Sequence, residues 1–156
     1  MAFQLTSPAF KHESEMPARH TCNGFDVSPP LSWSGSPERT KSFALVLDDP
    51  DAPDPRAPKR TWVHWVLYDI PSTTVSLSED ASHEELPART REGRNDWHTV
   101  GYRGPCPPVG RHRYFFKLYA LDTLLGDLEF PGKAKLEEAM RGHVLGQATL
   151  MCTYGH

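Results

Sequence analysis

Proline is the feature of this sequence that most restricts its fold: 15 of the 156 residues are proline, and 11 more are glycine. Both residue types interrupt helices, so a chain that carries them along its whole length favours strands joined by turns. The length suits one domain, and a hydrophobic fraction of 38% with a charged fraction of 24% is typical of a globular protein. We therefore expect a single β-rich domain over residues 1–156.

Runs of β-branched and aromatic residues predict where the strands lie. The four long strands are expected at residues 41–47, 61–70, 113–121 and 147–154, with short ones near Phe3, Phe10 and residues 31–33. Residues 134–141 are expected to be helical, because they are good helix formers and Gly142 follows where helices commonly end. Residues 72–100 show little periodicity and predict a long loop. The result is a mainly β sandwich with one or two short peripheral helices.

The charge and the cysteines exclude some classes of protein. The net charge is -3, whereas a protein that binds nucleic acid normally carries a basic balance, so we expect no nucleic acid partner. Cys22, Cys106 and Cys152 are three in number and lack CxxC spacing. This pattern predicts neither a disulfide framework nor a zinc site, and we interpret the cysteines as small buried hydrophobes, with Cys106 the one that its loop could expose.

The N-terminus and the hydropathy bear on location. The first residues lack a basic segment followed by an apolar run, which predicts no signal peptide, and no stretch has the length needed to span a bilayer. We expect a cytoplasmic protein without stable membrane insertion.

Three segments carry side chains suited to binding a ligand. The first holds Asp49 and Asp51 in a proline-rich turn that is expected to follow the strand at 41–47. Clustered carboxylates at a strand end lie where binding groups often occur, although a turn in which they bind the backbone explains them equally well.

The second segment is the predicted strand around His64. Strand alternation places Trp62, His64 and Val66 on one face, and Val63, Trp65 and Leu67 on the other. A histidine between apolar neighbours is either a core residue or the floor of a pocket.

The third segment runs from Gly101 to Tyr114 and is rich in glycine and proline. Alternation places His112 and Tyr114 on one strand face with Arg113 opposite. Glycines leave room for a ligand to approach backbone N–H groups, which bind anions. The six other histidines, His156 among them, are interpreted as surface or structural residues.

Together these segments resemble the phosphatidylethanolamine-binding protein family, also described as Raf kinase inhibitor-like proteins, and in particular its bacterial branch. The motifs that carry the resemblance are Asp49-Pro50-Asp51-Ala52-Pro53, Trp62-Val63-His64-Trp65, Gly104-Pro105-Cys106-Pro107-Pro108 and His112-Arg113-Tyr114. Further matches at residues 20–33, 93–96 and 142–147 extend it along the chain. It implies a sandwich of two antiparallel sheets with a small pocket near the surface, in a binding protein without a cofactor rather than an enzyme.

The resemblance also implies which residues form that pocket. They are Asp49, Asp51, Pro53, Trp62, His64, Gly104, Pro105, His112 and Tyr114, with Pro53 a candidate cis-proline. We expect the ligand to be a small anion or zwitterion, such as phosphate or a phosphoethanolamine-like head group. An aspartate would hold an imidazole whose other nitrogen donates to the anion, and a second carboxylate would meet the ammonium. The flanking basic residues are interpreted either as a rim that attracts anions or as a solvated charged surface; they are Arg56, Lys59, Arg60, Arg103 and Arg111.

Other functions stay open. The resemblance implies regulation of kinases or peptidases through protein contact, and it leaves a homodimer open. One alternative is a hydrolase that uses Asp49, Asp51, His64 and His112 as metal ligands or as acid and base, although the sequence has neither an HExxH nor a GxSxG motif. Another is an interaction protein with a vestigial pocket.

Overall fold

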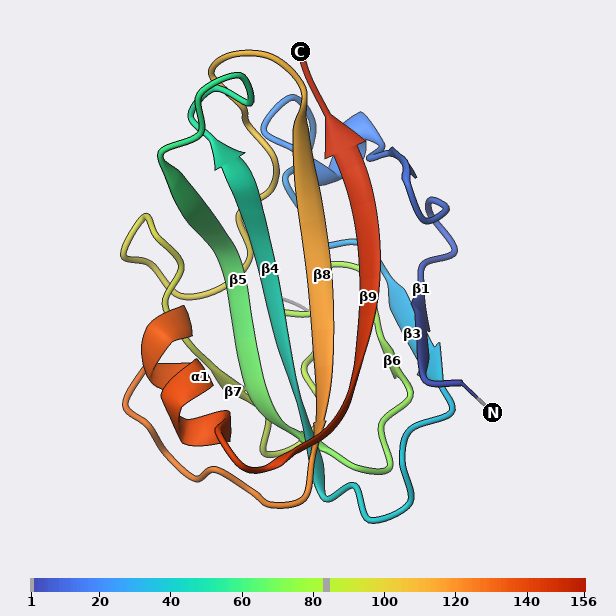
Figure 1. The fold of residues 1–156 in the computed structure, drawn as a ribbon. Coiled ribbons are helices and arrows are strands. Elements are labelled where there is room, and N and C mark those ends of the chain that lie inside the picture. Colours follow the sequence, from blue (N-terminus) through green and yellow to red (C-terminus); the bar gives the residue numbers. More distant parts are fainter. Residues whose placement is uncertain (1, 83–84) are drawn as a thin grey trace.

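The computed structural model describes residues 2–82 and 85–156, which form two β-sheets and one α-helix (Figure 1). In these residues the large sheet has six strands in the order β2-β9-β8-β4-β5-β7, and the small sheet has three in the order β1-β3-β6. The large sheet comprises β2 (Ser14–Glu15), β4 (Ser42–Ala52), β5 (Arg60–Pro71), β7 (Arg91–Glu92), β8 (His112–Leu121) and β9 (Val144–Tyr154). The small sheet comprises β1 (Gln4–Thr6), β3 (Leu31–Ser34) and β6 (Ser76–Leu77). A 3-10 helix, η1 (Ala18–His20), and the helix α1 (Lys133–Met140) complete the described elements.

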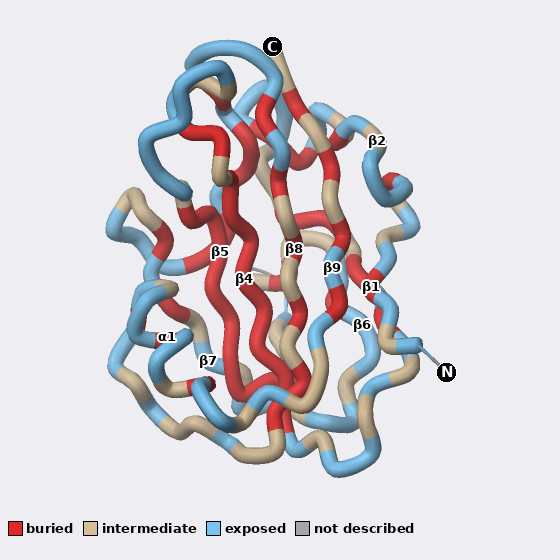
Figure 2. Tube along the Cα trace, viewed as in Figure 1, coloured by how far each residue is buried: buried red, intermediate tan, exposed pale blue. Residues whose placement is uncertain are grey.

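The large sheet is covered on both faces. Figure 2 shows β4 and β5 buried along most of their length, whereas β8 and β9 alternate between buried and more exposed residues. The larger core, with Phe43, Trp65 and Phe116, includes residues of both sheets. A second core joins Val46 and Val66 to Leu136 of α1. Central strands buried on both faces read as continuous apolar runs, which is why residues 41–47 have no polar alternation.

The predicted elements are largely confirmed. The four long strands and the helix lie within a few residues of their expected positions, and the mainly β two-sheet sandwich is observed. Phe10 is buried in the larger core but belongs to no strand. The aspartates at 49 and 51, expected in a turn, lie inside β4, which continues to Ala52.

The prediction about the cysteines is wrong for two of the three. Cys22 and Cys106 are exposed and joined by a disulfide across 84 residues of sequence. The spacing of the cysteines did not predict this bond, because contacts between residues far apart in the sequence bring the two loops together. The Tyr102 hydroxyl donates to the carbonyl of His20 at 2.7 Å, next to the bond. Cys152 is buried as expected, and burial raises the pKa of its thiol to about 12.

No helix in the described ranges is long and apolar enough to cross a membrane. A disulfide is typical of oxidising compartments, so it gives no support to the cytoplasmic location, which stays a prediction.

Candidate ligand-binding site

A cavity of about 430 Å³ lies where β4 ends and where β5 and β8 begin. These strand ends are at the top of Figure 1. This volume lies in the range of small-molecule sites. The lining residues are Asp49, Ala52, Pro53, Lys59, Arg60, Trp62, His64, Trp97, Cys106, Pro107, Pro108, His112 and Tyr114. The structure therefore brings together six residues that the sequence singled out: Asp49, Pro53, Trp62, His64, His112 and Tyr114. The Ala52–Pro53 peptide bond is cis, as the resemblance suggested.

The register of the large sheet places these side chains. Asp49 of β4 lies opposite Trp62 of β5, and β8 runs along the other edge of β4. His112 and Tyr114 are both buried on the cavity side of β8, while Arg113 between them is exposed. The predicted alternation on this strand is confirmed.

On β5 the alternation is interrupted at His64. Pairing with β4 passes from Leu47 opposite Trp65 directly to Asp48 opposite Val63, so His64 has no partner on β4. An extra residue of this kind is a β-bulge. Strict alternation fails at a bulge, so the side chains after it lie on the other face of the sheet than the one predicted for them.

Because of the bulge, part of the predicted distribution of side chains between the two faces of β5 is wrong. Trp62 and His64 share the cavity, as predicted. Trp65, which was expected on the opposite face from His64, lies in the larger core that also contains Tyr114. Val66, which was expected beside His64, lies in the second core, beneath α1. The bulge thus allows His64 to border the cavity while Trp65 packs in the sandwich interior.

His112 and Asp49 form a buried pair in the cavity wall. His112 Nδ1 lies 2.6 Å from Asp49 Oδ2, and His112 Nε2 lies 2.8 Å from the carbonyl oxygen of Val109. Burial raises the pKa of Asp49, and the hydrogen bond with His112 opposes this rise. Nε2 must donate to Val109, so one further proton lies between Nδ1 and the carboxyl group. Wherever that proton sits, the pair has no net charge.

His64 is held differently from His112. Its Nδ1 donates to the carbonyl oxygen of Arg103 at 2.7 Å, and its ring packs edge-on against Trp97 and Tyr114. Burial lowers its pKa to about 4, so the ring is neutral at pH 7 and its Nε2 is an acceptor. The expected pairing of imidazole with aspartate therefore occurs at His112, whereas a backbone carbonyl orients His64.

The rest of the lining includes two tryptophan rings and two cationic side chains at the border of the cavity. The Trp62 and Trp97 rings meet edge to face, with 5.4 Å between centroids, and the Arg60 guanidinium lies 5.7 Å from the centre of the Trp62 ring. Burial and the nearby Asp49 raise the pKa of Tyr114, which keeps its hydroxyl protonated. Neither Lys59 nor Arg60 forms an ion pair with a carboxylate of residues 2–82 or 85–156.

Asp51, a predicted pocket residue, is not among those that line the cavity. Its carboxylate accepts two hydrogen bonds from the Arg113 guanidinium, at 2.9 and 3.0 Å, and one from the Arg113 backbone N–H at 2.9 Å. These bonds lower the pKa of Asp51. The structure therefore gives this carboxylate a different partner from the ligand ammonium that we expected.

Gly104 and Pro105, also predicted, shape the loop behind the cavity. Gly104 N–H donates to Asp26 Oδ1 at 2.9 Å, and a Cβ at this position would lie only 2.1 Å from the carbonyl oxygen of His20. The carbonyl of Pro105 accepts a hydrogen bond from the Cys22 N–H at 3.1 Å. Both residues thus fix the loop that carries Cys106 and the two following prolines into the cavity wall.

Trp97 is a lining residue that sequence reasoning missed, because it lies in the segment 72–100, which was predicted to be a long loop and which includes the short strands β6 and β7. The motif at residues 93–96 was the available signal. Asn95 Oδ1 accepts from the Trp97 N–H at 3.0 Å, and Asp96 Oδ2 accepts from the Val63 N–H at 2.7 Å. The motif therefore anchors the loop on β5 and brings Trp97 over the cavity. His83 lies outside the described residues.

The cavity does not gather the aspartates and histidines as metal ligands. Within the described chain, one group of three His, Cys, Asp or Glu side chains has ligand atoms within 4.8 Å of one another, and it is Cys22, Cys106 and His156, of which the two cysteines are joined by the disulfide. The metal-dependent hydrolase alternative therefore gains no support from the geometry of Asp49, Asp51, His64 and His112.

Two packed β-sheets, with a small cavity at one end of the larger sheet, define a class of β-sandwich domains. A model of the phosphatidylethanolamine-binding protein family matches residues 6–155. The chain belongs to this family.

Individual relatives agree with this assignment. A UPF0098 protein of Methanothermobacter thermautotrophicus is 51% identical over 153 residues, which cover 96% of this chain and 97% of that protein. The structure of CT736 from Chlamydia trachomatis, described as a homolog of phosphatidylethanolamine-binding proteins, superposes with a TM-score of 0.90 at 40% identity, over 99% of this chain and 98% of that one. The structure of E. coli YbcL, described as a member of the mammalian family, gives a TM-score of 0.90 at 34% identity, over 100% and 99% of the two chains.

Proposed function

We propose that this protein binds a small zwitterion that carries a phosphate monoester and an amine, of the phosphoethanolamine type, without transforming it. The observation that carries the proposal is the division of the cavity wall. Lys59 and Arg60 supply positive charge at its border, whereas the rest of the wall includes the rings of Trp62, Trp97 and Tyr114 and has no net charge at Asp49–His112.

The phosphate end of the ligand fits the cationic border. Lys59 and Arg60 line the cavity, and neither is engaged by a carboxylate of the described residues. Hydrogen bonds from ammonium or guanidinium groups to phosphate are the strong, charge-assisted kind. The attraction for the anion is assigned to these side chains rather than to imidazolium rings, because His64 is neutral and His112 shares its charge with Asp49.

The amine end fits the aromatic interior. The rings of Trp62 and Trp97 line the cavity, and a cation over the face of such a ring gains about 0.5–2 kcal/mol. The Nε2 atom of His64 is an acceptor on a ring that also lines the cavity, and it suits an ammonium donor.

Isothermal titration calorimetry at pH 7.5 with phosphoethanolamine, inorganic phosphate and ethanolamine tests the proposal. We expect phosphoethanolamine to bind more tightly than either fragment. Replacing both Lys59 and Arg60 by alanine should weaken binding about tenfold or more, since each removes a hydrogen bond to a charged group. Lys41→Ala, an exposed lysine at the start of β4 and far from the cavity, is the matched control.

Two results would refute the proposal. One is equal affinity for phosphoethanolamine and inorganic phosphate, which would remove the amine from the recognition. The other is unchanged affinity in the Lys59 and Arg60 double variant. No heat with any of the three ligands would favour the alternative of an interaction protein with a vestigial pocket, and regulation of kinases or peptidases by protein contact stays a prediction.

A further inference from the structure

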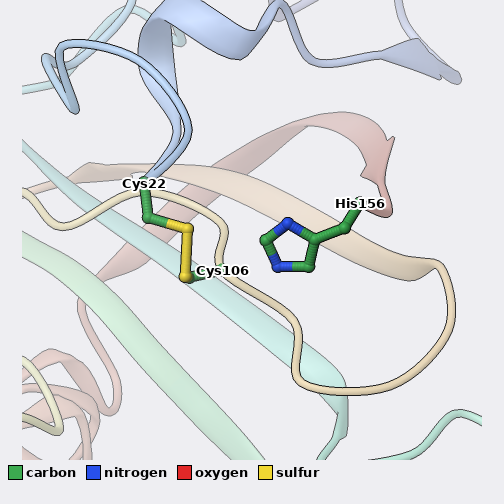
Figure 3. Close-up of side chains that lie close together, drawn as sticks. All are labelled: Cys22, Cys106 and His156. Atoms are coloured by element: carbon green, nitrogen blue, oxygen red, sulfur yellow. A yellow bond between two sulfur atoms is a disulfide. The ribbon is translucent and has the colours of Figure 1, made fainter.

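Three side chains with metal-binding atoms meet outside the cavity at the disulfide. Figure 3 shows the imidazole of His156 beside the bond between Cys22 and Cys106. One ligand atom from each residue lies within 4.8 Å of the other two, and all three residues are exposed. They come from the loop after η1, the loop before β8 and the chain after β9.

The two cysteine loops are held together by more than their disulfide. The Cys22 N–H donates to the carbonyl of Pro105 at 3.1 Å, one residue before Cys106. The Tyr102 hydroxyl donates to the carbonyl of His20 at 2.7 Å. These hydrogen bonds join the two chain segments independently of the sulfur–sulfur bond.

His156 is held at the same place by its own contacts. Its Nδ1 lies 2.8 Å from the side-chain amide of Asn23, and its ring packs edge-on against Tyr154 at 6.1 Å. The same amide bonds the Tyr154 hydroxyl at 2.6 Å. With the Asn23 amide rotated by 180°, its oxygen accepts from both the hydroxyl and an Nδ1–H, a partner of the kind that metal-bound histidines require, and Nε2 is left for the metal.

We propose that Cys22, Cys106 and His156 form a redox-gated zinc site, which is open in the dithiol state and closed by the disulfide. A dithiol reductant transfers two electrons and two protons to the Cys22–Cys106 bond and is itself oxidised to a disulfide. Binding of Zn²⁺ by the two thiols then releases their two protons to solvent. The site is distinct from the proposed zwitterion site and does not depend on that function.

The donor set determines the class of ion. Two thiolates and one imidazole are the ligands of zinc, whereas calcium and magnesium prefer oxygen. Around a tetrahedral zinc, Zn–S bonds of about 2.3 Å separate two thiolates by roughly 3.8 Å, a distance that released thiols can adopt within this cluster. The described residues supply three ligands, and water completes the tetrahedron. The exposure of all three residues gives both the reductant and the ion access from solvent.

Cobalt(II) is the probe of choice, because thiolate ligands give it intense near-ultraviolet charge-transfer bands and tetrahedral geometry gives it strong visible bands. The whole chain is reduced with a phosphine, which does not compete for the metal, and is titrated under argon. We expect one cobalt per chain with both sets of bands in the reduced protein, and neither set in the oxidised protein. Zinc should displace the cobalt and should raise the Tm of the reduced protein only.

Variants separate this site from adventitious binding by thiols. His156→Ala should weaken cobalt binding by at least about tenfold, since even the loss of an outer partner of a ligand costs this much. Cys22→Ser and Cys106→Ser should each abolish the charge-transfer bands. The matched controls, Cys152→Ser for the buried thiol and His98→Ala for another exposed histidine, should leave both affinity and spectrum unchanged.

The inference fails if the reduced protein shows no charge-transfer bands, or if His156→Ala binds cobalt as tightly as the parent chain. It also fails if Cys152→Ser removes the bands, or if zinc leaves the Tm of the reduced protein unchanged, because the ion would then be bound elsewhere or by unfolded chains.

Discussion

Replacing His64 by glutamine is expected to flatten the dependence of stability on pH in the acid range. The imidazole is buried, with 3% of its residue surface exposed, and burial lowers its pKa from 6.5 to about 4. Glutamine keeps a side-chain N–H that can donate to the Arg103 carbonyl, but it does not titrate. The difference in stability between the parent chain and His64→Gln therefore measures the effect of protonating His64.

The sign and size of this change in the free energy of unfolding follow from proton linkage. Between pH 6.5 and about 4, the unfolded chain binds a proton at His64 that the folded chain does not, so the free energy of unfolding falls as the pH falls through this window. One pKa unit is equivalent to about 1.4 kcal/mol. The contribution of His64, fully present above pH 6.5, therefore shrinks by about 3 kcal/mol on the way to pH 4.

Urea unfolding at half-unit steps from pH 7.5 to pH 4, followed by tryptophan fluorescence and circular dichroism, measures this difference. The parent chain should lose about 3 kcal/mol more than His64→Gln over the window, whatever the offset between them at pH 7.5. His98→Gln, at an exposed histidine, should follow the parent profile. Parallel profiles for the parent and His64→Gln would show that His64 is not a neutral, desolvated ring. The description of His64 as an uncharged acceptor in the cavity wall would then be wrong.

Two further variants test the roles given to predicted pocket residues. Asp51→Asn should lower the free energy of unfolding by roughly 1–2 kcal/mol, because it weakens the pair with the half-exposed Arg113, and calorimetry should find the affinity for phosphoethanolamine unchanged. Gly104→Ala should cost about 2 kcal/mol or more in urea unfolding, because its Cβ would meet backbone at 2.1 Å, whereas Gly132→Ala, with nothing within 4 Å, should cost less than about 1 kcal/mol. If Asp51→Asn binds phosphoethanolamine more weakly than the parent chain, Asp51 must contribute to the binding site.

The sequence determined those features that depend on neighbours along the chain. The strand at residues 113–121 and the pairing of His112 with Tyr114 on one face follow from a local period of two, which backbone geometry imposes. The helix that ends before Gly142 follows from local propensity and from a residue that accepts a positive φ. The family motifs, spread along the whole chain, were also sufficient to select the pocket segments.

Only the tertiary structure decided the charge and the partners of those residues. The bulge that gives His64 its place depends on pairing between β4 and β5, and the neutral state of its ring depends on burial by Trp97 and Tyr114. The disulfide between Cys22 and Cys106 joins loops 84 residues apart. A local pattern specifies backbone conformation, but desolvation, ion pairing and thiol contact are set by segments that meet only after the chain has folded, and no spacing in the sequence records those meetings.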